Sequence, residues 1–195
     1  MWYYKLIWKK LRTISEQKSS GFTLIELILT MSAGLVLMIC FSFLLKFTIE
    51  SNRVIESNNE ILLNGRYAIE YIKQEVRLAD MIISSDKFDL LNERYENNFG
   101  FVVVKFNPNE VLKYNYSTYY FEDNKIIRIA TNTFNFTFPN GNSFGGYNVV
   151  AEHIKSVEGT TIDFDNRLIN IKLILEGKNQ LSLNMSIGIR CPIIH

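Results

Sequence analysis

An almost uninterrupted apolar run extends from Phe22 to Leu45, and it limits what the chain can fold into more than any other feature. A core helix rarely stays apolar beyond about 14 residues, and the apolar part of a secretory signal spans about 7 to 15 residues. This run is longer than either, and it continues into FLLKFTIE. We therefore expect a membrane-spanning helix over residues 22–47.

Basic residues gather before this run. Residues 1–21 carry five Lys or Arg residues and a single acid, Glu16. Because the cytoplasmic flanks of membrane helices are enriched in Lys and Arg, this asymmetry predicts a cytoplasmic N-terminus and an extracytoplasmic chain after about Lys46. Residues 47–195 hold slightly more acidic than basic residues, 18 against 15. That balance offers no basic surface for nucleic acid.

One carboxylate, Glu26, occupies the fifth position of the apolar run. An acid near the middle of a membrane helix costs about 2.5 to 3.5 kcal/mol on insertion scales, so it needs a partner. One candidate partner is local, because Thr23 and Glu26 have the T-x-x-E spacing of a capping box at a helix start. The second candidate partner is a charged group outside this turn of helix. The residues alone do not decide between the two partners.

The sequence around Gly21 matches a known pattern. Ser19, Ser20 and Gly21 leave a flexible, sterically open peptide bond in front of the apolar helix. With its basic leader and span-length helix, GFTLIEL resembles the N-terminal motif of type IV prepilins. The resemblance implies that a prepilin peptidase cleaves between Gly21 and Phe22 and methylates the new amine of Phe22. Glu26 could then neutralise its own amine or that of a neighbouring subunit. The resemblance favours the neighbouring subunit, in which case Glu26 sets the axial register of assembly.

Apolar residues keep a helical spacing beyond the membrane segment. They recur at intervals of three, four and seven residues, at Val54, Ile61, Ala68, Ile72, Val76, Ala79 and Ile83. Charged residues fall on the other faces, which is typical of an amphipathic helix that packs one face on a domain. We expect this helix over residues 48–83, with any bend near Asn64-Gly65.

Residues 64–80, NGRYAIEYIKQEVRLAD, carry a second resemblance. They are similar to a pattern in minor pilins of the PilW type and in the related J pseudopilin of type II secretion, matched here at Arg66, Tyr67, Ala68, Glu75, Arg77 and Ala79. The membrane helix lacks the proline that many major pilins carry. The two resemblances together imply a set of subunit-packing residues, which are Leu24, Leu27, Arg66, Ala68, Glu75, Arg77 and Ala79.

From about residue 99 the sequence favours β-strands. Segments rich in Val, Ile, Thr, Tyr and Phe with partial alternation cover residues 99–106, 111–138, 159–165, 167–175 and 180–190. Turn residues separate them, and we expect surface loops at 84–98 and 139–148. The expected fold is therefore α+β and pilin-like, with the long N-terminal helix packed on a mostly antiparallel β-domain over residues 84–195.

No constellation of catalytic residues is evident. The chain has two histidines and no motif of a zinc protease, a nucleophile elbow or a phosphate-binding loop. Asp163, Asp165 and Asn166 lack the spacing of a calcium loop. Cys40 and Cys191 lie in the membrane segment and near residue 195, and we expect both thiols to be unpaired. We expect no enzyme activity, no cofactor and no metal site.

Two classes of function fit these features. The leading one is a minor type IV pilin, made as a prepilin, that helps to initiate or cap a pilus or the pseudopilus of type II secretion. Its expected partners are a prepilin peptidase, other minor and major pilins, the inner membrane and the assembly platform protein, with no nucleic acid. The alternative is a single-pass anchored binding module or adhesin with an extracytoplasmic β-domain. Cleavage after Gly21 discriminates between them, because an ordinary anchor has no use for it.

Overall fold

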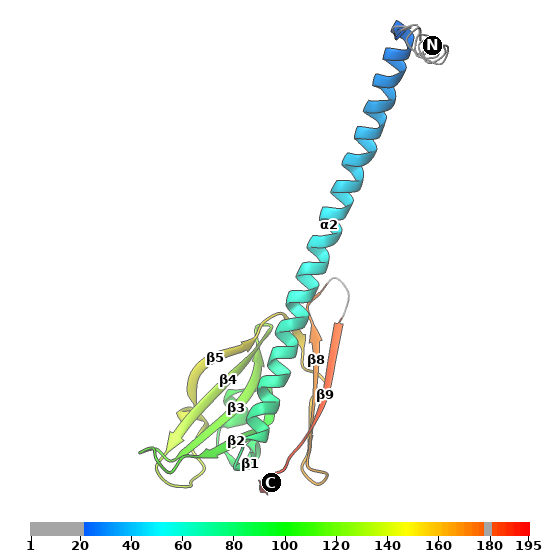
Figure 1. Cartoon of the computed structure of the whole chain (residues 1–195). Coiled ribbons are helices and arrows are strands. Elements are labelled where there is room, and N and C mark those ends of the chain that lie inside the picture. The colour runs from blue at the N-terminus through cyan, green and yellow to red at the C-terminus, as the bar shows by residue number, and fades with distance from the viewer. Residues whose placement is uncertain (1–21, 178–180) are drawn as a thin grey trace, which may run out of the picture. The chain divides into compact units, whose positions relative to one another are not determined.

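One long helix precedes a series of strands in the computed structural model, which describes residues 22–177 and 181–195 (Figure 1). The helices are α2 (Leu24–Arg77), η1 (Ser85–Lys87), α3 (Leu91–Arg94) and η2 (Gly141–Ser143). The strands are β1 (Met81–Ser84), β2 (Asn98–Phe106), β3 (Tyr114–Glu122), β4 (Lys125–Thr133), β5 (Gly145–Ala151), β6 (Ile154–Ser156), β7 (Thr161–Asp163), β8 (Leu168–Leu175), β9 (Leu181–Gly188) and β10 (Ile193–Ile194). The expected α+β fold is confirmed.

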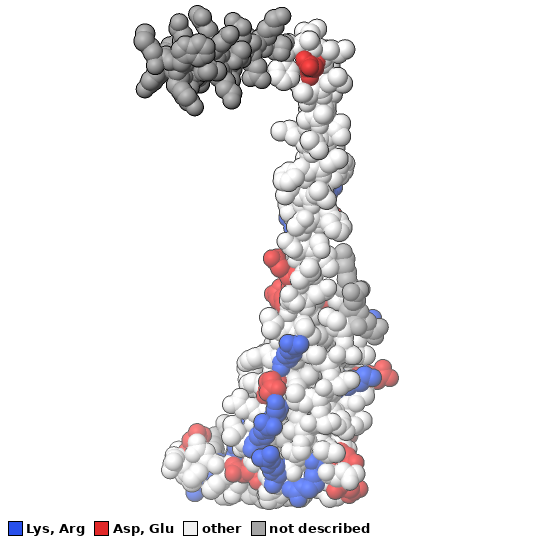
Figure 2. Space-filling view, turned by 45° about the vertical axis from the view of Figure 1, so that its right-hand side comes forward, with Lys and Arg blue, Asp and Glu red and all other residues white. Residues whose placement is uncertain are grey.

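The chain divides into two units between Asn52 and Arg53, inside α2. In the first unit every described residue is exposed, and the helix is long and apolar enough to cross a membrane. Its Ser and Thr hydroxyls donate to backbone carbonyls three or four residues earlier, at Thr30, Ser32, Ser42 and Thr48. These polar groups are thus satisfied within the helix, as a lipid environment requires. Figure 2 shows how few charged side chains this stretch carries.

The second unit contains a six-stranded sheet in the order β10-β1-β2-β3-β4-β5 and a smaller sheet in the order β6-β8-β7, with β9 on β8. Neighbouring strands are antiparallel except for β1 and β10, which are parallel. The β3–β4 hairpin turns at Asp123 and Asn124, both with positive φ, which Asn and Asp tolerate better than most residues.

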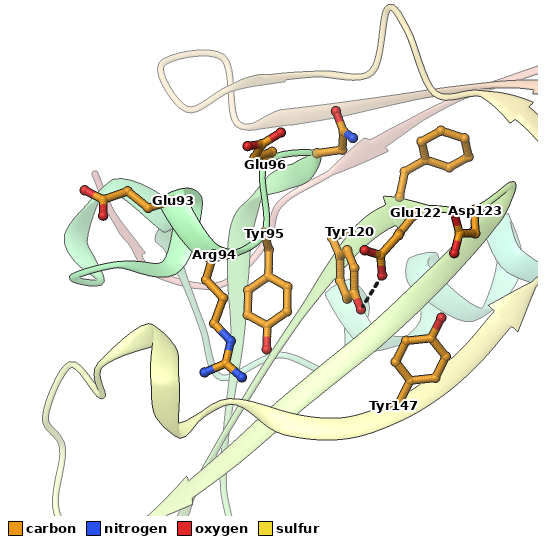
Figure 3. A pocket seen from close by; sticks show the side chains of 10 residues that line it. Glu93, Arg94, Tyr95, Glu96, Tyr120, Glu122, Asp123 and Tyr147 are labelled. Carbon is orange, nitrogen blue, oxygen red and sulfur yellow. Dashed lines mark hydrogen bonds between the residues drawn. The ribbon is translucent and has the colours of Figure 1, made fainter.

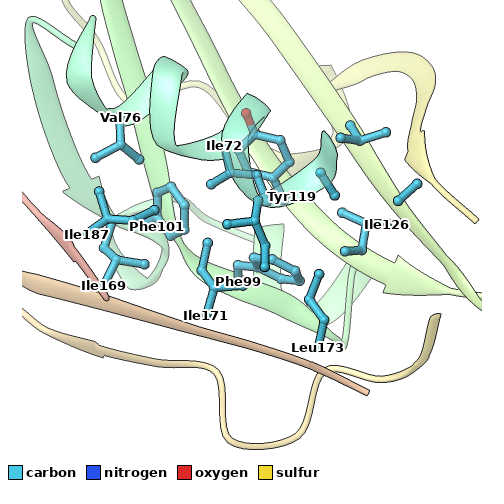
Figure 4. Packing of buried hydrophobic residues seen from close by; sticks show 14 of the residues in the cluster. Ile72, Val76, Phe99, Phe101, Tyr119, Ile126, Ile169, Ile171, Leu173 and Ile187 are labelled. Carbon is cyan, nitrogen blue, oxygen red and sulfur yellow. The ribbon is translucent and has the colours of Figure 1, made fainter. Parts of the chain in front are cut away.

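The buried face of α2 packs against inward residues of both sheets (Figure 4). Ala68 and Ile72 are fully buried and share this core with Phe101 and Tyr119 of the larger sheet and Ile171 of the smaller one. Burying one such isoleucine or phenylalanine side chain stabilises the fold by about 1.5 to 3 kcal/mol. The C-terminal part of α2 is therefore a core element of the domain.

α2 ends at Arg77, whereas the apolar spacing predicted a helix to residue 83. The Asp80 N–H donates to the Val104 carbonyl over 2.9 Å, and the Asp80 carboxylate accepts from the Phe106 N–H over 2.7 Å. These contacts attach the chain to β2 as it leaves the helix, and the next residues pair with β2 as β1. The prediction was wrong because strand pairing of a Met-Ile-Ile-Ser segment outweighs its helical spacing. The helix continues without interruption through Asn64-Gly65, where we expected any bend.

Two segments predicted as surface loops contain regular structure instead. Residues 84–98 include η1 and α3, with Phe88 and Leu91 buried. Residues 139–148 include η2 and the start of β5, with Phe144 buried. These side chains cover the face of the six-stranded sheet that is turned away from α2, where they form a second core. The sequence did not reveal this second core, because these apolar residues stand among many polar residues that are typical of loops.

Candidate functional site

The start of α2 is closed by a reciprocal capping box. The Glu26 N–H donates to the Thr23 hydroxyl oxygen over 3.3 Å, and the Thr23 N–H donates to the Glu26 carboxylate over 3.0 Å. The Thr23 hydroxyl donates to the same carboxylate oxygen over 2.9 Å. Each side chain thereby satisfies a backbone donor that the first turn of a helix leaves unpaired. The local candidate partner of Glu26 is therefore present, and pairing with a neighbouring subunit stays a prediction.

The residues next to this cap lie on an uncovered apolar surface. Phe22 precedes the helix and is exposed, and so are the predicted packing residues Leu24 and Leu27. A continuous apolar surface of this kind is normally covered by lipid or by another protein. The predicted leader, residues 1–21 with the cleavage residue Gly21, lies outside the described residues.

The predicted packing residues of the second unit separate into two groups. Arg66 and Arg77 are exposed, so they remain available to a partner. Ala68 is 0% exposed, Glu75 is 7% exposed and Ala79 packs against the core. The prediction that Ala68 and Glu75 contact other subunits was therefore wrong, because the protein's own β-domain covers them. Ala79 is partly buried and packs against the same core.

Apolar side chains also occupy the exposed side of this helix. Leu63 and Tyr67 in α2, and Leu78 directly after its last residue, are 64%, 60% and 61% exposed. Leu63 and Tyr67 are four residues apart, so they lie on one face of the helix. Together with Arg66 and Arg77 they belong to the exposed surface of α2 in the second unit, which another helix can reach.

Glu75 lies at the centre of a buried network of polar side chains. Arg128 donates from Nε to Glu75 Oε2 over 2.9 Å and from a terminal nitrogen to Oε1 over 3.1 Å. Lys105 donates to Oε1 over 3.0 Å, Ser117 donates to Oε2 over 3.2 Å, and the Tyr119 hydroxyl also donates to Oε2. Strands β2, β3 and β4 all supply donors to this one carboxylate. The network therefore joins α2 to the middle of the six-stranded sheet.

The charge of Glu75 is stabilised despite its burial. Burial alone would raise its pKa, but the hydrogen bonds from Arg128 and Tyr119, with the nearby charge of Arg128 and the bond from Lys105, lower the pKa to about 2. Burial, followed by the negative charge of Glu75, raises the pKa of Tyr119, which stays a neutral donor. A fully paired carboxylate of this kind fixes the position of a helix, and it has no free atom for a ligand.

A surface cavity of about 540 Å³ lies between α3, the β3–β4 turn and β5 (Figure 3). Glu122 accepts a hydrogen bond from the Tyr120 hydroxyl over 3.4 Å. Arg94 donates a hydrogen bond to the side-chain oxygen of Asn142 over 2.9 Å. Burial and the nearby Glu122 raise the pKa of Tyr120 to about 12, so the ring stays an uncharged phenol. The remaining lining residues are Glu93, Tyr95, Glu96, Asn97, Phe121, Asp123 and Tyr147. This lining can accept hydrogen bonds and attract cations, but it contains no Ser, Cys, Lys or His that could act as a nucleophile.

Within residues 22–177 and 181–195, no group of three or more His, Cys, Asp or Glu side chains is arranged to hold a metal ion. Asp163 and Asn166 instead bond to each other in a turn, over 2.7 and 2.8 Å. Cys40 and Cys191 are free thiols.

No protein-family model, curated protein or solved structure matches this chain.

Proposed function

We propose that the protein is a minor subunit of a type IV pilus-like filament, made as a membrane-anchored prepilin. The supporting observation is the dual character of α2. The N-terminal part of this one helix is apolar and uncovered, whereas its C-terminal part supplies the core of an antiparallel β-domain. A helix with a bare apolar half suits a subunit that is first held in lipid and then transferred to a bundle of similar helices.

The start of the helix adds a second argument. The carboxylate of Glu26 accepts two hydrogen bonds from Thr23, which leaves acceptor capacity on an ionised carboxylate. Cleavage before Phe22 would create a cationic amine next to the membrane surface. An incoming subunit that placed Glu26 beside such an amine would gain a charge pair in a dry environment, where a misplaced charge is costly.

The exposed face of α2 in the second unit supplies further contact area. Leu63, Tyr67, Arg66 and Arg77 lie outside the chain's own core and combine apolar and cationic side chains. Aromatic and arginine side chains are enriched in protein interfaces. We assign this face to contacts with neighbouring subunits, in place of the buried Ala68 and Glu75.

Processing after Gly21 tests this proposal. In cells with a prepilin peptidase the mature chain should begin at N-methylated Phe22, and Gly21→Val should retain the leader, because a bulky side chain blocks access to the bond. Mass spectrometry of the N-terminal peptide measures both results. A chain that kept residues 1–21 in the assembled filament would contradict the proposal.

The cavity in Figure 3 favours a second candidate, an anchored module that binds an external ligand. Its open, polar lining is accessible on the surface of the β-domain. This alternative requires the membrane helix only as an anchor, so it predicts no cleavage and no dependence of function on Glu26.

A further inference from the structure

Strand β9 forms a long, free edge of the smaller sheet. It pairs with β8 over eight consecutive residue pairs, from Leu168↔Gly188 to Leu175↔Leu181, without a shift in register. Within the described part of the chain no strand pairs with its other side. In Figure 1 β9 lies beside β8 as the outer strand. Alternate backbone N–H and C=O groups along this edge therefore have no partner strand.

The other sheet edges are short or irregular. β10 has two residues, β6 and β7 have three each, and β5 carries register shifts against β4 and the sequence Gly145-Gly146. Natural proteins protect edge strands by such shortness and irregularity, by proline or by charged side chains. The sequence of β9, LSLNMSIG, contains no charge and no proline, and its pairing contains no bulge. β9 thus lacks the short length, bulge, proline and charge that commonly prevent strand addition.

The side chains of β9 are also incompletely covered. Leu181, Leu183 and Met185 face the core and pack against it, yet each remains partly exposed. Ser182 and Asn184 face solvent on the other side of the strand. An additional strand along β9 would cover the outer flank of the three apolar side chains and would satisfy the backbone groups of the edge.

We infer that the edge of β9 receives an extended strand from a different subunit of the same filament. The backbone donors and acceptors of the edge select an extended segment. Because β9 offers no charged side chain to pair with, the segment should be uncharged and alternate apolar with polar residues. This inference rests on the proposed function.

An antiparallel pair of β9 strands from two copies of this chain fits the edge less well than a strand from a different subunit. Antiparallel pairing of β9 with β9 is two-fold symmetric, and the axis reverses every direction in the plane of the sheet. The helical segment 53–77 packs along this sheet, with Gly65 against Leu175 and Leu183. This helical segment would run in opposite directions in the two copies. In chains anchored in one membrane, however, the helix runs from the membrane to the β-domain in the same direction in every copy.

Hydrogen exchange tests the inference. The full-length protein, alone in detergent micelles and co-purified with the other pilin subunits, is compared by mass spectrometry of peptides that cover residues 181–188. We expect alternate amides of β9 to exchange rapidly in the lone protein and at least tenfold more slowly in the assembly. The amides of β8 residues 168–170, which lie between β7 and β9, serve as the internal reference.

Ser182→Lys supplies the matched variant, because Ser182 is exposed and lies opposite Ile174 of β8. It adds a charge to the exposed face of the edge strand without entering the core or standing directly opposite another charge. It should leave β8 exchange unchanged, abolish the protection of β9 and reduce co-purification at least tenfold. Asn109→Lys, which adds the same charge to an exposed turn, should do none of these.

Three results would overturn the inference. If the protein co-purifies with other pilins but β9 exchange is unchanged, strand addition at β9 is rejected and the proposed function stands. If it co-purifies with no pilin, both strand addition and the proposed function are rejected. The third concerns a second copy, because an antiparallel β9 pair centred on residue 184 would place that residue opposite itself. Oxidation of Asn184→Cys to a disulfide dimer, in a chain with Cys40 and Cys191 replaced by serine, would identify that copy as the occupant.

Discussion

Glu26 serves the helix start within one chain, and this local role can be separated from a role between chains. In a capping box Gln replaces Glu without loss of the acceptor, but it carries no charge. We expect Glu26→Gln to be inserted and cleaved normally and to be incorporated into filaments at least tenfold less, because only a carboxylate can neutralise an amine. Glu26→Val should behave in the same way. Immunoblots of sheared filaments against the membrane fraction measure this, and normal incorporation of the Gln variant would leave capping as the only role.

Glu75 makes the stability of the β-domain depend on pH. Its folded-state pKa of about 2 lies below the ordinary value of 4.5, so its contribution is full above pH 4.5 and is lost as the pH falls towards 2. A difference of this size corresponds to about 3 kcal/mol. At pH 7 we expect Glu75→Gln to lower the free energy of unfolding by about 3 to 5 kcal/mol, since Arg128 then stays buried without its counterion.

Urea denaturation from pH 7 to pH 3 measures this linkage. The difference between the wild type and Glu75→Gln should narrow as the pH falls below 4.5. Glu70→Gln is the control, because Glu70 forms an exposed pair with Lys73 and should change stability by less than about 0.5 kcal/mol. A constant difference in the free energy of unfolding between wild type and Glu75→Gln from pH 7 to pH 3 would contradict the lowered pKa of Glu75.

Among the short elements, η2 packs closely against the start of α3 at Gly141. A Cβ at this position would come within 2.6 Å of the Leu91 backbone, and the Gly141 N–H donates to the Asp89 carbonyl over 2.8 Å. Because backbone cannot give way as a side-chain tip can, we expect Gly141→Ala to lower the free energy of unfolding by about 1 to 3 kcal/mol. Gly145→Ala, with open space at its Cβ, should change it by less than about 0.5 kcal/mol. Equal effects of the two variants in thermal denaturation would contradict this packing.

Elements with a strong local pattern were predicted from the sequence, and elements defined by distant partners were not. The apolar run and its helical continuation predicted α2, and each β-rich segment contains at least one observed strand. β1 was missed because its residues continue a helical spacing, and only pairing with β2 makes them a strand. β10 has two residues and depends on β1. Neither pairing leaves a signal in local sequence.

The buried network could have been recognised in part. Ile72, Glu75, Val76 and Ala79 recur at intervals of three and four, so the sequence placed Glu75 on the apolar face of the helix. An acid in an apolar stripe requires a buried partner. Arg128 is 53 residues away on β4, and sequence spacing does not identify a partner across a sheet.

At the scale of the whole molecule, the proposed function predicts a scarce component that starts assembly. Deleting the gene should reduce the number of filaments at least tenfold, because a missing initiator leaves the abundant subunit without a template. The abundant subunit should still be synthesised and stay in the membrane. Electron microscopy counts the filaments, and quantitative mass spectrometry of purified filaments measures the stoichiometry. A chain present in equal amount along the shaft would be a major subunit instead.

The parallel pairing of β1 with β10 has a consequence for the order of events in biosynthesis. β1 follows α2 directly, but its outer partner is formed by Ile193 and Ile194. A chain that emerges N-terminus first, from the ribosome or across a membrane, exposes β1 long before β10 is available. The larger sheet therefore reaches its final width only after residue 194 has emerged, and until then a chaperone has access to the unpaired side of β1.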